Sequence, residues 1–386
     1  MKWILKRIEY GRYKDIALMA LAAAICFGCS GGDSGGNETE PSRSFAMGFT
    51  PWPYEATIDA VSDTYQKIQA HGDIITHHLD GGVPWPEAFD GNATYSADLE
   101  GDIALRLANT EPDMPVCLAV TPLRTLRDAP ADYWGDSTGM TRPVPWDGYD
   151  FGDWQLVTAY TNYLLNLIDR FQPAYCNYAI EATEYIINHP DRASDLLDFL
   201  QQVYDTLKLT YPDLPLFISV TLKAPGSSNA QLVQSYAARI ASCSDLLGIS
   251  TYGYVFYGHA DSGNPDNLPT DWLSQAQAYA PGKTLAIAET GWIAENLFIP
   301  TYGNLTVDGS AAWQADYLRK LFAEADRLDV AFITWFSVID FDTLWQDTLG
   351  QDPLAQIWRD TGLYDGDVQP REALTVWDAW FVRPVR

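Results

Sequence analysis

The chain has 386 residues, of which 47% are hydrophobic and 19% charged, a balance typical of a globular protein with a large core and not of a disordered one. Its 51 acidic and 24 basic side chains give a formal net charge of −27, which repels nucleic acid and anionic membrane surfaces. We therefore expect no nucleic-acid partner. Aromatic residues make up 13% of the chain, an excess that suits either a large core or a surface for flat, sugar-like ligands.

The first 29 residues are predicted to be an export signal. Residues 1–15 are basic, and residues 16–27 form an apolar run that is too short to span a membrane. The Gly28-Cys29 junction resembles a bacterial lipobox, although Cys26 stands where that motif usually has Leu. Residues 30–44 are rich in Gly, Ser and acids, which is typical of a flexible tether. We expect an exported lipoprotein anchored through Cys29 at the bacterial outer membrane or cell surface, with periplasmic or extracellular secretion as the alternative.

From residue 45 onward, short apolar runs alternate with longer amphipathic segments. The predicted strands are 45–49, 74–78, 116–121, 175–181, 216–221, 246–250, 285–289 and 331–336. The clearest predicted helices are 56–70, 154–171, 193–211, 230–242, 271–279, 311–328 and 372–381. No stretch that resembles a linker divides residues 45–386, so a single domain is expected.

Eight strand–helix units in one domain predict an α/β fold, a single (β/α)8 TIM barrel. A doubly wound open sheet is the alternative, but no glycine-rich phosphate loop follows the first strand. In a (β/α)8 barrel the functional site forms at the carboxyl ends of the strands. Acidic and aromatic residues gather at these positions in the sequence, as a site would require.

The seventh predicted strand carries the strongest candidate. Leu285 to Ala288 form a buried strand that runs directly into Glu289, and Thr-Gly-Trp follows. A carboxylate at the end of such a strand is costly to bury without a function. We predict that Glu289 is a catalytic carboxylate, and a glutamate that caps the next helix is the alternative.

Hydrolysis of a glycosidic bond needs two carboxyl groups, one to protonate the leaving oxygen and one to attack or to activate water. The fourth strand supplies Glu181 and Glu184. If Glu181 faces the barrel interior, Asn177 and Ala179 share its face, whereas an inward Glu184 would push Glu181 into the apolar helix layer. Alternation therefore favours Glu181 over Glu184, and a bulge at the strand end would overturn this choice.

Two segments resemble a known group. Ala-Ile-Glu181-Ala-Thr and Ile-Ala-Glu289-Thr-Gly-Trp resemble the acid/base and nucleophile strands of the retaining (β/α)8 glycoside hydrolases of clan A. The Glu-Thr-Gly-Trp form is similar to that of plant-type β-1,3-glucanases and endo-β-1,4-galactanases, and residues 361–377 resemble the closing segment of such enzymes. The resemblance implies that Glu289 is the nucleophile and Glu181 the general acid/base.

The same resemblance implies that Tyr252 hydrogen-bonds the nucleophile and that Trp335 lies under the reacting sugar. A tyrosine hydroxyl is expected to keep Glu289 ionised, while a drier pocket raises the pKa of the acid. One position departs from the clan, which usually has Asn directly before the acid/base. Here that position is Ile180, or Thr183 if Glu184 is the acid.

Further residues at the strand ends are predicted to bind substrate. Because the apolar face of a pyranose fits an indole, stacking on sugar is expected of Trp52, Trp85, Trp292 and Trp335, with core packing as the alternative. His78, Asp80 and Thr183 are expected to hydrogen-bond substrate. His77 and His78 are adjacent in a strand and point in opposite directions, so no metal site is predicted.

The sequence therefore predicts an exported, monomeric glycoside hydrolase that acts on a β-linked polysaccharide or oligosaccharide without a cofactor. A surface lipoprotein that binds glycans on the same barrel without cleaving them is the alternative, and Ile180 in place of Asn favours it. An unrelated barrel such as an aldolase would need a lysine at a strand end, for which Lys223 is the candidate.

Overall fold

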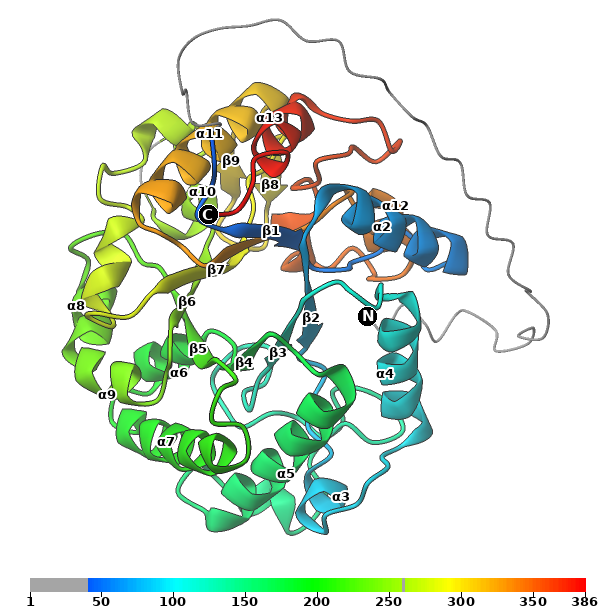
Figure 1. Ribbon diagram of the computed structural model, residues 1–386, viewed down its shortest axis with the longest axis vertical. Coiled ribbons are helices and arrows are strands. Elements are labelled where there is room, and N and C mark those ends of the chain that lie inside the picture. The colour runs from blue at the N-terminus through cyan, green and yellow to red at the C-terminus, as the bar shows by residue number, and fades with distance from the viewer. Residues whose placement is uncertain (1–40, 259–260) are drawn as a thin grey trace, which may run out of the picture.

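The structure is a computed structural model that describes residues 41–258 and 261–386. Its centre is a closed barrel of parallel strands in the order β1-β10-β7-β6-β5-β4-β3-β2 (Figure 1). The strands are β1 (Ala46–Phe49), β2 (Ile74–Leu79), β3 (Val116–Val120), β4 (Tyr175–Ala179), β5 (Leu216–Thr221), β6 (Leu247–Thr251), β7 (Leu285–Thr290) and β10 (Phe332–Trp335). The predicted single (β/α)8 barrel is confirmed. The predicted signal peptide, with Cys29, and residues 30–40 of the tether lie outside the described residues.

Helices surround the barrel (Figure 1). They are α2 (Ile58–His71), α3 (Trp85–Phe89), α4 (Ala97–Asn109), α5 (Trp154–Phe171), α6 (Ala182–Asn188), α7 (Ala193–Thr210), α8 (Ser228–Ser235), α9 (Ala237–Ser242), α10 (Gly253–Phe256), α11 (Ala311–Arg327), α12 (Asp342–Asp347) and α13 (Glu372–Phe381). A small hairpin, β8 (Leu297–Ile299) with β9 (Leu305–Val307), follows β7. Within the described residues, no helix combines the length and apolar character needed to cross a membrane.

Two of the predicted helices differ in form from the observed ones, and α4 and the short helices α3, α6, α10 and α12 were not among the clearest predicted helices. The segment 230–242 is divided at Tyr236 into α8 and α9, and residues 274–278 form a 3-10 helix inside the predicted segment 271–279. The sequence did not single out α4, because its buried face carries Asp102 and Arg106. These two side chains form an ion pair of 2.7 Å. Charged residues at buried positions interrupt the apolar periodicity by which an amphipathic helix is predicted.

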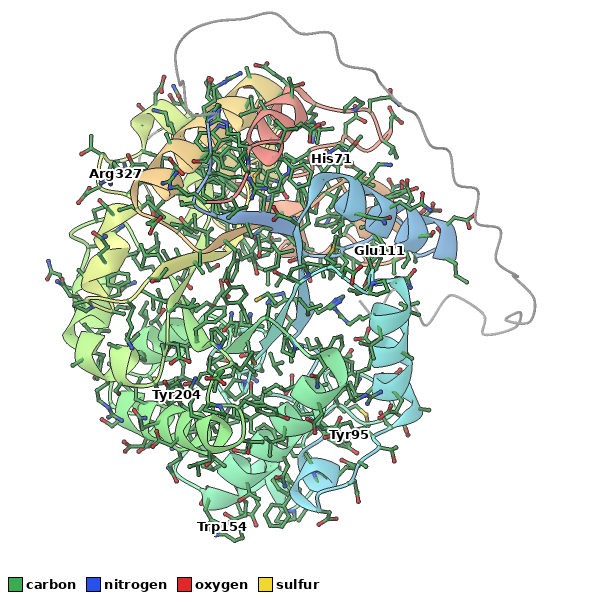
Figure 2. The ribbon with its side chains drawn as sticks, viewed as in Figure 1. His71, Tyr95, Glu111, Trp154, Tyr204 and Arg327 are labelled. Atoms are coloured by element: carbon green, nitrogen blue, oxygen red, sulfur yellow. The ribbon has the colours of Figure 1, made fainter. Side chains whose placement is uncertain are left out.

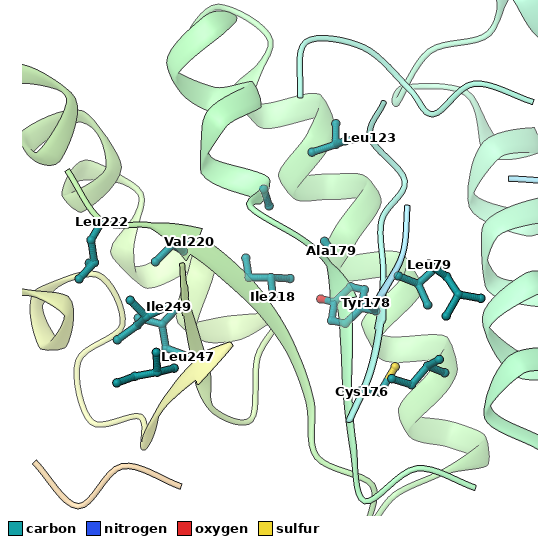
Figure 3. Packing of buried hydrophobic residues seen from close by; sticks show 14 of the residues in the cluster. Leu79, Leu123, Cys176, Tyr178, Ala179, Ile218, Val220, Leu222, Leu247 and Ile249 are labelled. Carbon is teal, nitrogen blue, oxygen red and sulfur yellow. The ribbon is translucent and has the colours of Figure 1, made fainter. Parts of the chain in front are cut away.

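The core has two layers. Between barrel and helices lie outward-facing strand residues such as Tyr178, Ile218 and Ile249 (Figure 3). A smaller cluster fills the barrel itself and comprises Ile74, Cys117, Phe217, Leu246, Ala286, Ala288 and Phe332. The rings of Tyr175 on β4 and Phe332 on β10 meet across the barrel at 4.9 Å. The barrel is therefore a packed core on which the site rests, and not an open channel.

The two ends of the domain meet beside β1. Arg43 is buried, pairs with Asp73 and forms a parallel bridge with Val385. The packed domain thus includes Arg43, which lies within the tether predicted for residues 30–44.

The last helix, α13, is fastened to α2. His71, labelled in Figure 2, lies at the end of α2. It contacts Asp378 at 2.7 Å and Tyr364 at 2.9 Å, and its carbonyl accepts a hydrogen bond of 2.7 Å from the indole of Trp377. The C-terminal helix therefore helps to close the barrel wall at β1.

Candidate active site

A pocket of about 630 Å³ opens where the barrel strands end, a volume within the range of small-molecule sites. Its wall is built by strand ends and by the loops after β1, β3, β6 and β10. Six residues that the sequence singled out line it, namely Trp52, His78, Asp80, Glu181, Glu184 and Glu289. Trp52 and Glu289 are 237 positions apart in the chain, and they share one cavity because the barrel closes.

Glu289 reaches the pocket through a bulge in β7. The pairing of β7 with both β6 and β10 shifts register at this point, so that Glu289 pairs with Ser250. Ala288 belongs to the interior cluster of the barrel, yet the next residue, Glu289, also lines the pocket. Regular alternation would send Glu289 toward the helices, and the extra residue of a bulge turns it inward.

The exit from β7 also explains the glycine that follows. A Cβ atom on Gly291 would lie 2.5 Å from the carbonyl oxygen of Phe336, a distance that real contacts do not show. Gly291 is needed because β7 and the end of β10 approach closely here.

Glu289 is held by two neighbours. The hydroxyl of Tyr252 donates to Glu289 Oε1 at 2.6 Å, and His78 Nε2 lies 3.8 Å from Oε2. The hydrogen bond from Tyr252 that the resemblance implies is therefore present. Tyr252 is itself buried, and desolvation together with the charge of Glu289 raises the pKa of its phenol, so it stays a proton donor.

The electrostatics of Glu289 differ from the expectation. Burial raises its pKa above the ordinary glutamate value, and the negative charge of Glu181 raises it further. His78 and the hydrogen bond from Tyr252 lower the pKa, but they do not outweigh burial. The residue predicted to be kept ionised is thus the one whose charged form is disfavoured.

Glu181 is placed by a turn and not by strand alternation. β4 ends at Ala179 after a register shift, and Glu181 follows in the left-handed conformation with φ of 53° as the N-cap of α6. Its N–H donates to Ser219 Oγ at 2.9 Å. The carboxylate accepts from Ser250 Oγ at 2.7 Å and from Arg127 Nε at 3.3 Å. The predicted strand 175–181 was two residues too long, although the favoured glutamate does line the pocket.

Glu184 lies one turn further along, in α6. Its carboxylate forms an ion pair of 2.6 Å with Lys223, which follows β5. Both Glu184 and Lys223 line the pocket. The negative charge of Glu181 is among the causes that raise the pKa of Glu289 and of Tyr252, whereas Glu184 is paired with Lys223.

Of the four tryptophans predicted to stack on sugar, three are core residues. The indole N–H groups of Trp85, Trp292 and Trp335 donate to backbone carbonyls at 2.8–2.9 Å, and all three side chains are fully buried. Trp292 is stacked on Tyr317 at 4.3 Å. The stacking prediction is wrong for these three because their faces are covered by protein, whereas Trp52 lines the pocket.

Thr183 and Tyr252 support the site from behind the pocket. Thr183 is buried, and its hydroxyl accepts a hydrogen bond of 3.2 Å from the N–H of Thr221. Tyr252 lies behind Glu289 and is absent from the pocket lining. The predicted hydrogen bond to substrate is therefore wrong for Thr183, whereas Tyr252 makes the predicted hydrogen bond to Glu289.

The two adjacent histidines point in opposite directions, as alternation predicts. His77 is buried on the helix side, where Nε2 lies 2.8 Å from Thr110 Oγ1. His78 and Asp80 line the pocket. Burial alone would raise the pKa of Asp80, but the charges of His78 and Arg127 outweigh it, so the pKa is lowered and Asp80 is held as a carboxylate.

The sequence missed an apolar wall. It is formed by Trp52 together with Phe256, Phe336, Phe341, Leu349, Leu354 and Trp358. The rings of Phe336 and Phe341 lie 5.8 Å and 5.9 Å from that of Trp52. Most of the charged lining residues follow β2 to β5 or end β7, whereas Arg106 comes from α4 and Asp352 from the segment after β10.

A group of acids lies beside the pocket, after β10. Carboxylate oxygens of Asp340, Asp342 and Asp360 lie within 4.8 Å of one another. Arg371 contacts Asp340 at 2.6 Å, and Arg359 contacts Asp360 at 2.8 Å and Asp342 at 3.1 Å. Two guanidinium groups therefore supply the positive charge that holds these carboxylates together.

The sequence matches no protein-family model and no curated protein. The structure is similar to solved structures of low sequence identity. An exo-β-1,4-mannosidase from Opitutaceae bacterium strain TAV5 aligns with a TM-score of 0.58 and 13% identity over 88% of this chain and 59% of its own. The chain thus spans about three fifths of that protein's length.

Two other solved structures are matched over most of their length. A GH5_18 protein from Streptomyces cattleya, in complex with Manβ1-4GlcNAc, gives a TM-score of 0.59 and 16% identity over 87% of this chain and 80% of its own. Xylanase 10B from Thermotoga maritima gives a TM-score of 0.57 and 13% identity over 88% of this chain and 95% of its own. The chain has the (β/α)8 fold of these glycoside hydrolases.

Proposed function

We propose that the protein is a retaining glycoside hydrolase, with Glu289 as the nucleophile and Glu181 as the general acid/base. The observation that carries the proposal is that these two carboxylates, which follow β4 and end β7, line a single pocket. Each is fixed by its own donors, Tyr252 for Glu289 and Ser250 with Arg127 for Glu181. The resemblance of the two strands to clan A and the shared fold support the same assignment.

The chemistry needs both groups in turn. In the first step Glu289 attacks the anomeric carbon while Glu181 gives its proton to the leaving oxygen, and a covalent glycosyl–enzyme forms. In the second step Glu181 takes a proton from water, which displaces Glu289 from the anomeric carbon and releases the sugar. Tyr252 stabilises the negative charge on Glu289 before attack and after release.

The substrate that suits the pocket is a β-linked glycan of neutral sugars. The aromatic side of the pocket, beginning with Trp52, offers faces for pyranose rings, and His78 and Asp80 offer hydrogen bonds to hydroxyls. The similar solved structures include a β-1,4-mannosidase and a xylanase, whose names indicate such substrates. The high negative charge of the chain disfavours polyanions.

Export as a monomeric lipoprotein through Cys29 forms part of this proposal and rests on the sequence of residues 1–29. Mass spectrometry of the protein from its native membrane would test it. A lipid-modified N-terminal Cys29, lost in Cys29→Ser, is expected. An unmodified, soluble wild-type protein would contradict the anchor without touching the catalytic proposal.

The catalytic proposal is tested by release of reducing ends from a panel of β-mannans, xylans, glucans and galactans. Wild type is expected to cleave at least one of them, and Glu289→Gln is expected to lose about 10³-fold or more of that rate. Glu295→Gln, an exposed glutamate on the segment after β7, is the matched control and should keep the wild-type rate. If wild type and Glu289→Gln bind a glycan equally and neither releases reducing ends, the barrel binds glycans without cleaving them.

A further inference from the structure

Arg127 contacts the proposed acid/base but has no part in the chemistry described above. Its Nε lies 3.3 Å from Glu181 Oε2, while Ser250 occupies Oε1. The side chain of Arg127 is only 8% exposed, and that of Glu181 is 21% exposed. A charged contact of this kind is shielded from solvent far better than an ordinary surface ion pair.

The backbone around Arg127 is built to hold it. Residues 123–130 double back on themselves, with an antiparallel bridge between Leu123 and Pro130. Within this hairpin the N–H of Arg127 donates to the carbonyl of Arg124 at 2.8 Å, and Arg124 pairs with Asp128. Arg127 lies near the tip, where its side chain enters the pocket.

The hairpin is also fastened to the helix that Glu181 caps. His189 is the C-cap of α6, and its Nε2 lies 2.8 Å from the carbonyl oxygen of Asp128. Glu181 stands at the opposite end of the same short helix. The hairpin therefore contacts both ends of α6, through Arg127 at Glu181 and through Asp128 at His189. These two contacts fix the position of Arg127 relative to Glu181.

Arg127 and Glu181 both have a left-handed backbone conformation, which residues other than glycine rarely adopt. The φ angles of Arg127 and Glu181 are 54° and 53°. Such conformations cost roughly 1 kcal/mol or more each and persist only where the surroundings enforce them, most often at functional sites. Two strained residues that pair with each other inside the pocket indicate that the pair serves the site.

We propose that Arg127 is a positioning residue, which orients the carboxyl group of Glu181 toward the leaving oxygen. The inference rests on the proposed function. Arg127 fixes the carboxyl group of Glu181 in the orientation from which it acts as an acid in the first step and as a base in the second. Arg127 itself is neither the nucleophile nor the acid of the proposed reaction.

Leaving-group dependence tests this role, because a dinitrophenolate leaves without protonation and a sugar does not. The comparison uses kcat/KM, which reports the first chemical step, for a dinitrophenyl glycoside and for an oligosaccharide of the same sugar. Arg127→Met is expected to lower kcat/KM by about 10–100-fold on the oligosaccharide and by less than about 3-fold on the dinitrophenyl glycoside.

Two further variants keep the test decisive. Arg127→Lys retains a cation beside Glu181, so its loss of kcat/KM on the oligosaccharide should be smaller than that of Arg127→Met. Arg170→Met, which removes a partly buried arginine paired with Glu100 at 2.8 Å away from the pocket, controls for the loss of an ion pair and should leave both rates unchanged.

The outcomes separate this inference from the proposed function. Glu181→Gln should show the same preference for the activated leaving group, in stronger form. Suppose that Glu181→Gln shows this preference but Arg127→Met lowers kcat/KM equally on the oligosaccharide and on the dinitrophenyl glycoside. Arg127 then binds substrate, and the positioning role is wrong. If Glu181→Gln retains full rate on the oligosaccharide, the acid/base assignment itself fails. Should Arg127→Met not fold, equal loss of both substrates in Arg127→Lys would overturn the positioning role.

Discussion

Glu289 must be ionised in order to attack, yet burial raises its pKa. Activity should therefore fall on the acid side at a pH above the ordinary glutamate value of 4.5. Tyr252→Phe removes a hydrogen bond that lowers this pKa, so the acid limb of kcat/KM should move to still higher pH. The rate at the optimum should fall about 10–100-fold, the usual cost of one hydrogen bond to a charged group.

A pH profile of kcat/KM for wild type and Tyr252→Phe measures this shift. Tyr160→Phe is the control, because it also removes a buried tyrosine hydroxyl but one that donates to the backbone carbonyl of Tyr178, far from Glu289. An acid limb that Tyr252→Phe leaves in place would show that the limb does not report Glu289.

The raised pKa of Glu289 also has a consequence for stability. The folded state holds this proton more tightly than the unfolded state, so stability falls as the pH rises from the ordinary carboxyl value through the raised one. Glu289→Gln removes the charge and should raise the melting temperature at pH 7, by roughly 1–4 °C if the relief is about 1 kcal/mol. At pH 4 the gain should disappear. Calorimetry at both pH values measures it, and a lower melting temperature at pH 7 would contradict the burial cost.

At this scale the sequence allowed both proposed catalytic residues to be predicted, because a glutamate that ends an apolar strand is unusual. It did not distinguish Trp52, which lines the pocket, from Trp85, which packs in the core. Both indoles follow a strand end, and only the loops that cover them differ. Nothing in the sequence marked Arg127, whose role depends on a hairpin contact with α6.

At the scale of elements, α13 closes the domain by inserting Trp377, which is fully buried and packs against Phe49 of β1 at a ring distance of 4.5 Å. Trp377→Ala should destabilise the protein by about 3–5 kcal/mol through the cavity that it leaves. Val382→Ala, on the exposed C-cap of the same helix, should have little effect. Urea titration measures the difference, and equal midpoints for both variants would show that α13 is not part of the folding unit.

The eight strands were predictable because buried parallel strands are short, apolar and separated by clear breaks. The bulges in β4 and β7 were not, since they depend on how neighbouring strands pair. The alternation argument thus selected Glu181 for a reason that the structure does not bear out, because Glu181 lies beyond the strand. Glu289 faces inward only because of the bulge.

For the molecule as a whole, barrel closure brings distant loops into one wall, so that Trp52 after β1 meets Phe336 and Phe341 after β10. If this wall binds sugar rings, Trp52→Ala should raise KM for an oligosaccharide about 10-fold, the cost of roughly 1–2 kcal/mol of stacking. Trp154→Ala is the control, since Trp154 is 62% exposed but does not line the pocket. Unchanged steady-state KM in Trp52→Ala would exclude the wall from substrate binding.

The order of strand ends around the barrel was predictable from the sequence, and with it the presence of acids in one place. The shape of the aromatic wall was not, because it is built from long loops after β6 and β10 whose paths depend on packing.

The central claim is that Glu289 forms a covalent bond to the sugar while Glu181 serves as acid and then base. Proton NMR during the first minutes of hydrolysis of a β-linked substrate observes the anomeric configuration of the product before mutarotation. The account predicts that the β-anomer appears first, with net retention. Appearance of the α-anomer first would show that water attacks directly, and it would contradict the role of Glu289 as the nucleophile.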